Sequence, residues 1–278
     1  MRILVDAMGG DLAPDEIVKG AVHAQQELGA EIVLVGQRAA IEACLRNEQA
    51  KLEIIDASEV ITMDDDPSTA TRRKKDASMT VALNMLRDGK GDAVVSAGST
   101  GALVVGGTLI VKRIKGVKRP AIGTVVPCKD GCFMMLDSGA NHDCRPEMLR
   151  QFGLMGSVYM KRILGVPNPR VGLVNIGVEE EKGNALVKET YPLLKENPYI
   201  NFVGSIEARE IPNGAADVVV CEAFVGNVIL KLYEGVGATL ISKVKQGMMT
   251  SLRSKIGALL VKPALKETLK SFDASEYG

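Results

Sequence analysis

The chain alternates between short apolar runs rich in β-branched residues and segments long enough to be helices, and this alternation narrows its possible folds most strongly. Apolar runs of this kind occupy residues 2–7, 32–36, 93–95, 171–176 and 218–221, and each leads through a polar turn into a longer segment. Strands that alternate with helices form a mainly parallel sheet covered on both faces. The sequence therefore predicts an α/β fold, and we expect a single domain over residues 1–278.

The remaining elements follow the same alternation. Further strands are predicted at residues 52–56, 122–126, 133–136 and 201–203. Helices are predicted at residues 15–28, 39–46, 77–87, 146–164 and 184–195, in the segment that follows residues 96–101, and from residue 227 onward. The basic run at residues 72–75 lies between a solvated loop predicted at residues 64–67 and the helix predicted from residue 77.

Ligands of a parallel sheet bind beyond the carboxyl ends of its strands, so the loops after the strands are where chemistry is expected. These loops are rich in Gly, Asn, Asp and Ser, and they comprise residues 6–11, 96–101, 137–141, 175–184 and 222–227.

The loop at residues 96–101, SAGSTG, ends a strand and opens a helix. The first N–H groups of a helix have no partner within it and favour an anion, while glycines let a ligand approach the backbone. Ser99 and Thr100 can donate hydroxyl groups to the same anion or cap the helix. Both readings, an anion site and a simple helix cap, stay open at this point.

Composition argues against several classes of partner. Lys plus Arg equals Asp plus Glu at 34 each, and Trp is absent, so the sequence favours neither a polyanion nor base stacking, and we expect no nucleic acid partner. The chain starts MRILVD, without the apolar stretch of a signal peptide. We also expect no segment apolar enough to span a bilayer, and hence a cytoplasmic protein.

The cysteines predict reduced thiols. Five cysteines with irregular spacing do not form a disulfide framework. Cys128 and Cys132 flank a turn signal and are expected to face each other across a hairpin. His142 and Cys144 lie nearby in sequence, but without a CxxC pair we favour structural thiols over zinc and expect no metal.

Several catalytic signatures are missing from the sequence. It contains no G-x-G-x-x-G fingerprint, no G-x-x-x-x-G-K-[ST] phosphate loop, no G-x-S-x-G elbow and no H-E-x-x-H motif. The two histidines are His23, inside a predicted helix, and His142 in a loop. A Ser-His-Asp mechanism is therefore not favoured.

Five motifs together carry a resemblance: DAMGGD, SAGSTGAL, LDSGAN, MGSVY and NIGVEEEKGN, with RRKK and ADVVVCEAFVGN between and beyond them. The chain resembles the bacterial phosphate acyltransferases of phospholipid synthesis along its whole length. The resemblance implies a three-layer α/β/α homodimer, similar in fold to phosphotransacetylases and isocitrate-dehydrogenase-like proteins. The family pattern continues past Gly278, so we expect part of it to lie outside this sequence.

The resemblance implies transfer of a long fatty acyl chain from the thioester of acyl carrier protein to inorganic phosphate, giving acyl phosphate, without a cofactor. Phosphate is already partly dianionic and a thiolate leaves readily, so the protein mainly has to position phosphate and stabilise the oxyanion with fixed donors. The expected phosphate-binding residues are Ser99, Thr100, Gly101, Gly9 and Gly10. The expected catalytic residues are Lys182, Asn184, Asn141, Asn175 and Asp137.

These assignments have structural alternatives. Each Asn is equally compatible with turn chemistry, because Asn tolerates left-handed geometry and bonds its own backbone. Lys182, the best single cation, follows three glutamates and could be a solvated surface residue. Asp137 is expected to orient Lys182 or a neighbouring donor.

The basic run comprises Arg72, Arg73, Lys74 and Lys75. It could bind the acidic carrier protein or incoming phosphate, or it could be a solvated loop, as most charge runs are. The resemblance favours a contact with the carrier protein.

The segment from residue 236 to 270 is a basic amphipathic segment within the domain. Between residues 243 and 270 seven basic residues stand against one acidic residue, a net charge of +6, and Pro263 is expected to separate two helical halves. Such a segment can lie on an anionic membrane surface, which would make the protein peripherally membrane-associated; a core stripe or a dimer seam is the alternative. The expected membrane-binding residues are Leu252, Ile256, Leu259, Leu260 and Val261.

Two other functions stay open. One is a phosphotransacetylase-like enzyme acting on a short acyl-CoA. The other is a non-catalytic protein that binds anions or a membrane surface.

Overall fold

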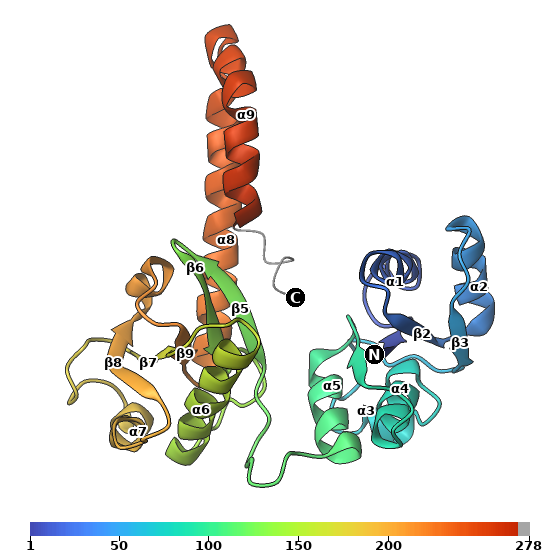
Figure 1. Ribbon diagram of the computed structural model, residues 1–278, viewed down its shortest axis with the longest axis horizontal. Helices are drawn as coiled ribbons and strands as arrows, with labels where there is room; N and C mark the ends of the chain where they lie inside the picture. The colour runs from blue at the N-terminus through green and yellow to red at the C-terminus, as the bar shows by residue number, and fades with distance from the viewer. Residues whose placement is uncertain (272–278) are drawn as a thin grey trace. The chain divides into compact units, whose positions relative to one another are not determined.

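The computed structural model describes residues 1–271, with side chains described as far as residue 265. The chain divides into two compact units, Met1–Gly116 and Val117–Gly278, each with its own sheet (Figure 1). Two sheets thus take the place of the one continuous sheet that the length of the chain suggested.

The sheet of the first unit is entirely parallel. Its strands are β1 (Arg2–Asp6), β2 (Glu31–Gly36), β3 (Glu53–Asp56) and β4 (Ala93–Val95), in the order β3-β2-β1-β4. Its helices are α1 (Asp15–Leu28), α2 (Arg38–Asn47), α3 (Ala70–Arg73), α4 (Ser78–Arg87) and α5 (Thr100–Gly106), which continues into a π-helical turn at Gly107–Val111.

Three layers form because successive strand residues point to opposite faces. In β2, Ile32 and Leu34 pack with α1 and α2, whereas Val33 and Val35 pack with Ala82 of α4. Both faces of this sheet are therefore buried, as the near-continuous apolar runs of its strands predict.

The second unit has a mixed sheet in the order β5-β6-β9-β7-β8. Its strands are β5 (Gly123–Cys128), β6 (Gly131–Leu136), β7 (Arg170–Asn175), β8 (Asn201–Glu207) and β9 (Val218–Val220). β5 pairs antiparallel with β6, and the other pairs are parallel. Its helical elements are α6 (Pro146–Arg162), α7 (Ala185–Lys195), a 3₁₀ segment at Ala208–Asn213, α8 (Ala223–Met248) and α9 (Leu252–Ser271).

Helices cover both faces of this sheet as well. Met134 and Leu136 of β6 pack with α6 and α7, whereas Phe133 and Met135 pack with the 3₁₀ segment and the first turns of α8. The three-layer α/β/α architecture predicted from the sequence is therefore confirmed in each unit.

The β5–β6 hairpin corrects one expectation. Cys128 pairs with Gly131, so the turn contains only Lys129 and Asp130. Cys132 is consequently one register position away and points to the opposite face, where it packs beside α6 while Cys128 packs beside the 3₁₀ segment. The expectation that the two thiols face each other is wrong.

α8 and α9 form a helical hairpin that extends beyond the sheet of the second unit (Figure 1). The break between them lies at residues 249–251, where the Ser251 hydroxyl accepts the N–H of Ser254 at 3.1 Å. Pro263 lies inside α9 and does not separate two helical halves, which corrects the prediction from the sequence.

By length and composition α8 is also apolar enough to cross a membrane, which corrects the expectation that no segment of the chain is. Its most apolar window has a mean hydropathy of 1.3, and 6% of that window is buried. The first turns of α8 nevertheless pack in the second unit through Ala223 and Gly226, and the helix carries an ion pair between Lys231 and Glu234.

Candidate functional site

In the first unit, the loops after β1 and β4 meet because these strands are parallel neighbours, with Val5 opposite Val95. Asp6, 1% exposed, joins the two loops: its Oδ2 accepts the Ser96 hydroxyl at 2.7 Å, and that hydroxyl oxygen accepts the N–H of Gly98 at 3.1 Å. Asp6 therefore holds the start of the SAGSTG loop against the strand beside it.

Glycines make this close approach possible. A Cβ added at Gly9 would lie 2.5 Å from Asp6 Oδ2 and 2.9 Å from Gly98 N, so a side chain there would separate the two loops. Gly10 has φ +115°, in the region that favours glycine. Gly9 and Gly10 thus lie against the loop of Ser99, as the prediction requires.

Ser99 is the N-cap of α5, and its Oγ accepts the N–H of Ala102 at 3.4 Å. The N–H groups of Thr100 and Gly101 belong to the first turn, which offers them no carbonyl within the helix. Thr100 is exposed, whereas Ser99 is buried. A Cβ at Gly101 would lie 2.9 Å from Pro67, so the helix start also fits closely against that loop.

In the basic run, Lys74 is bound within the protein whereas the other three side chains are exposed. Lys74 Nζ binds Asp65 Oδ2 at 2.6 Å and the Val60 carbonyl at 2.8 Å, and this ammonium group lowers the pKa of Asp65 to about 2. Lys74, at the C-terminal end of α3, therefore fastens the segment that precedes this helix. Arg72, Arg73 and Lys75 are exposed.

In the second unit, Asp137 is fully buried at the carboxyl end of β6. Oδ1 accepts the N–H groups of Ile122, Gly139 and Ala140 at 3.0–3.1 Å. Oδ2 accepts the N–H of Asn141 at 2.8 Å and its Nδ2 at 2.6 Å. Asp137 thus orients a neighbouring donor, Asn141, rather than Lys182, and it shapes the whole LDSGAN loop.

Both Nδ2 hydrogens of Asn141 are engaged, because the same nitrogen also donates to the Pro120 carbonyl at 2.7 Å. In this arrangement the amide hydrogens are used within the protein, which fits the turn role that the sequence left open for each Asn. Asn141 fastens the loop, and its carbonyl accepts the N–H of Ala223 at the start of α8.

α8 also meets this loop closely. Asn227 Nδ2 donates to the Ser138 carbonyl at 3.2 Å, and a Cβ at Gly226 would lie 2.0 Å from the Asp137 carbonyl oxygen. Only glycine at position 226 permits this approach.

Asn175 fixes the loop after β7. Its Nδ2 donates to the Lys182 carbonyl at 3.1 Å and to Ser205 Oγ at 3.2 Å, while its Oδ1 accepts the N–H of Ile176 at 2.8 Å. Gly183, with φ +100°, leaves room for this side chain, because a Cβ there would lie 2.5 Å from Asn175 Oδ1. As with Asn141, these contacts fit the turn role that the sequence left open for Asn175.

Lys182 and Asn184 lie on the exposed side of the same loop. Lys182 Nζ binds Glu179 Oε1 at 2.9 Å, which raises the pKa of the lysine and keeps it charged at neutral pH. Asn184 caps α7, with its Oδ1 accepting the N–H of Val187 at 2.9 Å, so its Nδ2 faces away from the cap.

Thiols near the site are held protonated. Burial, and then the charge of Asp137, raises the pKa of Cys144 to about 12, and burial raises the pKa of Cys221 further. Neither is a thiolate at neutral pH. Among residues 1–265, whose side chains the structure describes, no group of three His, Cys, Asp or Glu side chains is placed to hold a metal ion.

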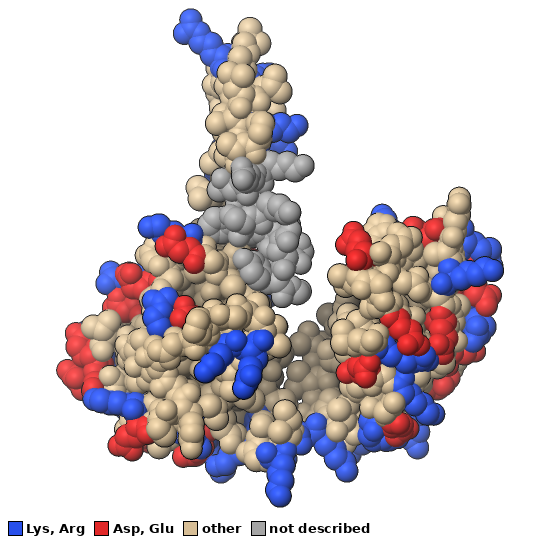
Figure 2. All heavy atoms as spheres, in the orientation of Figure 1, with Lys and Arg blue, Asp and Glu red and all other residues tan. Residues whose placement is uncertain are grey.

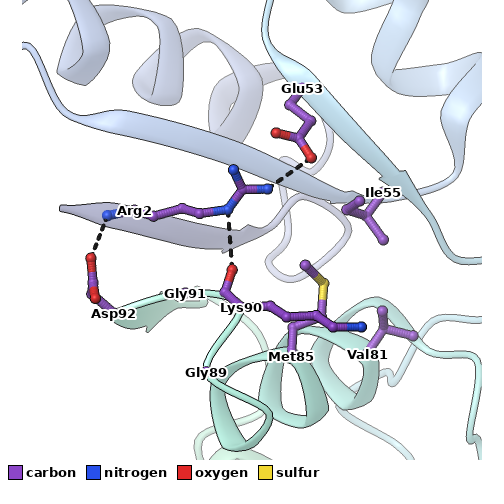
Figure 3. A pocket seen from close by; sticks show the side chains of 9 residues that line it. All are labelled: Arg2, Glu53, Ile55, Val81, Met85, Gly89, Lys90, Gly91 and Asp92. Atoms are coloured by element: carbon purple, nitrogen blue, oxygen red, sulfur yellow. Dashed lines mark hydrogen bonds and ion pairs between the residues drawn. The ribbon is translucent and has the colours of Figure 1, made fainter.

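An open cleft of about 650 Å³ lies at the opposite edge of the first unit's sheet (Figure 3). Arg2 crosses it to Glu53 at 2.8 Å and also pairs with Glu31, while Ile55, Val81 and Met85 form its apolar wall. Because it adjoins the amino ends of β1 and β4, it is separate from the loops that follow the strands.

The predicted site residues therefore form two groups. Gly9, Gly10 and the loop of Ser99–Gly101 meet in the first unit. The second group, at the carboxyl edge of the second unit's sheet, consists of Asp137, Asn141, Asn175, Lys182 and Asn184. The hydrogen bond between Asp6 and Ser96 was not predicted from the sequence, and neither were the contacts of Ser205 and Asn227. A carboxylate at the end of a strand, as in DAMGGD, is the signal that could have revealed the role of Asp6.

Comparison with known proteins gives a consistent family assignment. Residues 1–278 match the family described as Fatty acid synthesis protein. A Phosphate acyltransferase of Clostridium kluyveri is 49% identical, covering all of this chain and 84% of its own length. A Phosphate acyltransferase of Desulfitobacterium hafniense is 51% identical with the same coverage.

Solved structures with this fold share little sequence. A phosphotransacetylase from Streptococcus pyogenes superposes with a TM-score of 0.66 at 16% identity, covering 86% of this chain and 82% of that one. The EutD phosphotransacetylase from Staphylococcus aureus gives a TM-score of 0.62 at the same identity and coverage. At this identity the likeness concerns the fold alone.

Proposed function

The chain belongs to the phosphate acyltransferase family, and from this membership and the two loop groups we propose that it transfers a long-chain fatty acyl group from acyl carrier protein to inorganic phosphate. Acyl transfer to phosphate follows from the family. The carrier-protein thioester, the chain length and the assignment of residues are the parts that we add.

The first-unit loops supply a place for phosphate. Thr100 and Gly101 present backbone N–H groups at the start of a helix that continues to Val111, and Thr100 adds an exposed hydroxyl. The Asp6–Ser96 brace holds this loop in one shape before phosphate arrives. Fixed donors of this kind bind an anion without reorganisation.

The second-unit loop offers an exposed cation and an exposed amide side chain. Lys182 is the cation in a loop that Asn175 holds at two points, the Ile176 N–H and the Lys182 carbonyl, while its amide also binds Ser205 of β8. The ammonium group is therefore carried on a defined backbone. Asn184 Nδ2 is the amide donor that remains after Asn141 and Asn175 have been assigned to turns. This rigid loop with an exposed, charged Lys182 is the observation that supports the assignment most strongly.

The reaction needs no enzyme nucleophile. A phosphate oxygen attacks the thioester carbonyl carbon, forming a C–O bond and an oxyanion that fixed donors stabilise. The oxyanion collapses, the C–S bond breaks, and the thiolate leaves with the electron pair and takes a proton from water. The protonated thiols of Cys144 and Cys221 agree with direct attack by phosphate.

The test is phosphate-dependent thiol release from a long-chain acyl carrier protein thioester, with the acyl phosphate trapped as a hydroxamate. The same acyl chain on CoA, and acetyl-CoA, serve as comparisons. We expect hydroxamate only with phosphate and fastest with the carrier protein. Equal or faster turnover of acetyl-CoA would instead support a short-chain phosphotransacetylase, and phosphate binding without turnover would support a non-catalytic protein.

For the carrier protein, we propose a contact with the exposed cations Arg72, Arg73 and Lys75. Lys74 is excluded from this role because its ammonium group already binds Asp65 and the Val60 carbonyl. Reversing the charge of the three exposed residues should weaken binding of the carrier protein, whereas an unchanged affinity would remove this contact.

We further propose that α9 lies on an anionic membrane surface, which would make a cytoplasmic protein peripherally membrane-associated. Leu252, Ile256, Leu259 and Leu260 lie on one helix face and are 55–78% exposed, and Val261 is 46% exposed. Arg253, Lys255 and Lys262 add positive charge to the same helix. Leu259→Glu with Leu260→Glu should abolish flotation with anionic liposomes; flotation that persists would contradict this role.

α8 supports the homodimer that the resemblance implies. Beyond its first turn, its exposed apolar side chains recur every four residues, at Val228, Leu232, Val236, Leu240 and Val244. A ridge with this spacing packs into the same ridge of a second helix at a crossing angle of about −50°. We expect Leu232→Glu to convert a dimer to a monomer in sedimentation equilibrium, and an unchanged mass would exclude this seam.

A further inference from the structure

Large apolar side chains lie in the open at the same edge of the second unit's sheet as Lys182. Ile176 is 78% exposed and Val178 is 66% exposed, and both belong to the loop between Asn175 and Lys182. Phe224, at the first turn of α8, is 64% exposed. Each side chain leaves most of its surface in water, which is unfavourable unless something covers it.

The strand order makes these residues neighbours. β9 lies beside β7, with Val220 opposite Leu173 (Figure 1). Val220 is the last residue of β9, and the chain continues from it through Glu222 into α8, while β7 ends at Asn175. Ile176 and the turn that leads to Phe224 therefore leave the same edge of the sheet from adjacent strands.

The apolar residues stand on fixed backbone. The N–H of Ile176 donates to Asn175 Oδ1, and Glu222 accepts the N–H of Phe224 at 2.6 Å and that of Val225 at 3.0 Å. A preformed surface of this kind can bind an apolar ligand without the cost of ordering a loop.

We propose that Ile176, Val178 and Phe224 form the surface that receives the acyl chain of the thioester. The inference rests on the proposed function, because a fatty acyl group is the apolar ligand that the reaction brings to Lys182. Ile176 and Val178 share its loop, so a chain lying on them would hold its thioester carbon near the ammonium group. These residues therefore set the preference for chain length.

The test compares kcat/KM for thioesters with acyl chains of 8, 12 and 16 carbons, all on one carrier. Ile176→Ser with Val178→Ser should lower kcat/KM for the 16-carbon chain about tenfold and leave the 8-carbon chain nearly unchanged. Ile163→Ser is the matched control: this side chain is 65% exposed, at the end of α6 and the opposite edge of the sheet. A chain-length profile in the double variant that matches the control would overturn the inference, since a structural role would affect all chains alike.

A second measurement does not depend on turnover. An acyl thioester with a photoreactive diazirine along its chain is irradiated with the wild-type protein, and labelled peptides are identified by mass spectrometry. We expect label on residues 176–178 and on Phe224. Label at this position without acyl phosphate formation would refute the proposed function and keep this surface, whereas label confined to other segments would overturn the surface itself.

Discussion

Asp137→Asn is the substitution whose cost the structure defines best. The carboxylate accepts five hydrogen bonds at 2.6–3.1 Å in a site without solvent exposure. An amide accepts on one oxygen only and presents an NH₂ group to the other donors. The most favourable orientation still leaves the two donors of Asn141 unsatisfied.

Each buried donor left without an acceptor costs about 1–3 kcal/mol, so the variant should lose about 2–6 kcal/mol of stability in this region. The assay is amide hydrogen exchange of residues 139–141, read against Asp143→Asn. Asp143 is exposed two residues beyond the loop, and its substitution should change stability by less than about 0.5 kcal/mol.

We expect exchange of residues 139–141 to rise by at least about tenfold in Asp137→Asn, since 1.4 kcal/mol corresponds to a factor of ten. Exchange rates equal to those of Asp143→Asn would refute the reasoning, because they would show that the carboxylate does not hold the loop.

Three further predictions follow from the site. Lys182→Ala should lower kcat/KM about 100-fold, because it removes a transition-state cation. The control is Lys195→Ala, which breaks a comparable exposed ion pair with Glu180 at 2.6 Å and should leave kcat/KM nearly unchanged. Equal losses in the two variants would contradict the role of Lys182. A carboxyl titration by NMR should give Asp65 a pKa of about 2. The contribution of this carboxylate to stability is then present above pH 4 and is lost as the pH falls toward 2. Lys74→Met should raise the pKa of Asp65 toward about 3.9, and an unchanged pKa would exclude the ammonium group as the cause. Gly9→Ala should raise the KM for phosphate, because its Cβ would lie 2.5 Å from Asp6 Oδ2, and an unchanged KM would separate this contact from phosphate binding.

Much of the fold follows from hydrophobic periodicity. The helix predicted at residues 15–28 and the strands predicted at 93–95 and 133–136 are present with the same or nearly the same bounds, because burial on both sheet faces requires continuous apolar runs. Periodicity does not report how many sheets those strands form. The division at Gly116 was therefore not evident from the sequence.

Turn details were harder to predict because they depend on tertiary contacts. Whether the Cys128 hairpin has two or three turn residues decides which face each thiol occupies, and the turn signal fits both. The position of a break in a helix is similarly ambiguous: Pro263 gives the stronger local signal, yet the chain turns at Ser251, where a hydroxyl caps the next helix.

The sequence predicted which loops follow the strands, but it did not separate the possible roles of the residues in those loops. Asn141 and Asn175 are chemically able both to bind a substrate and to hold a turn, and only the positions of Pro120, Ser205 and the Lys182 carbonyl show that their amide hydrogens are used internally. Asp6 was missed because its partner, Ser96, lies 90 residues away in the chain.

The most direct test of the central claim, that phosphate itself attacks the thioester, is thiol release from a long-chain acyl carrier protein thioester in the absence of phosphate. Enzyme is used at a concentration comparable to the substrate, so that a single turnover can be observed. The account predicts no release until phosphate is added, followed by thiol and acyl phosphate in equal amounts. A burst of thiol equal to the enzyme concentration without phosphate would show an acyl-enzyme intermediate and contradict the account.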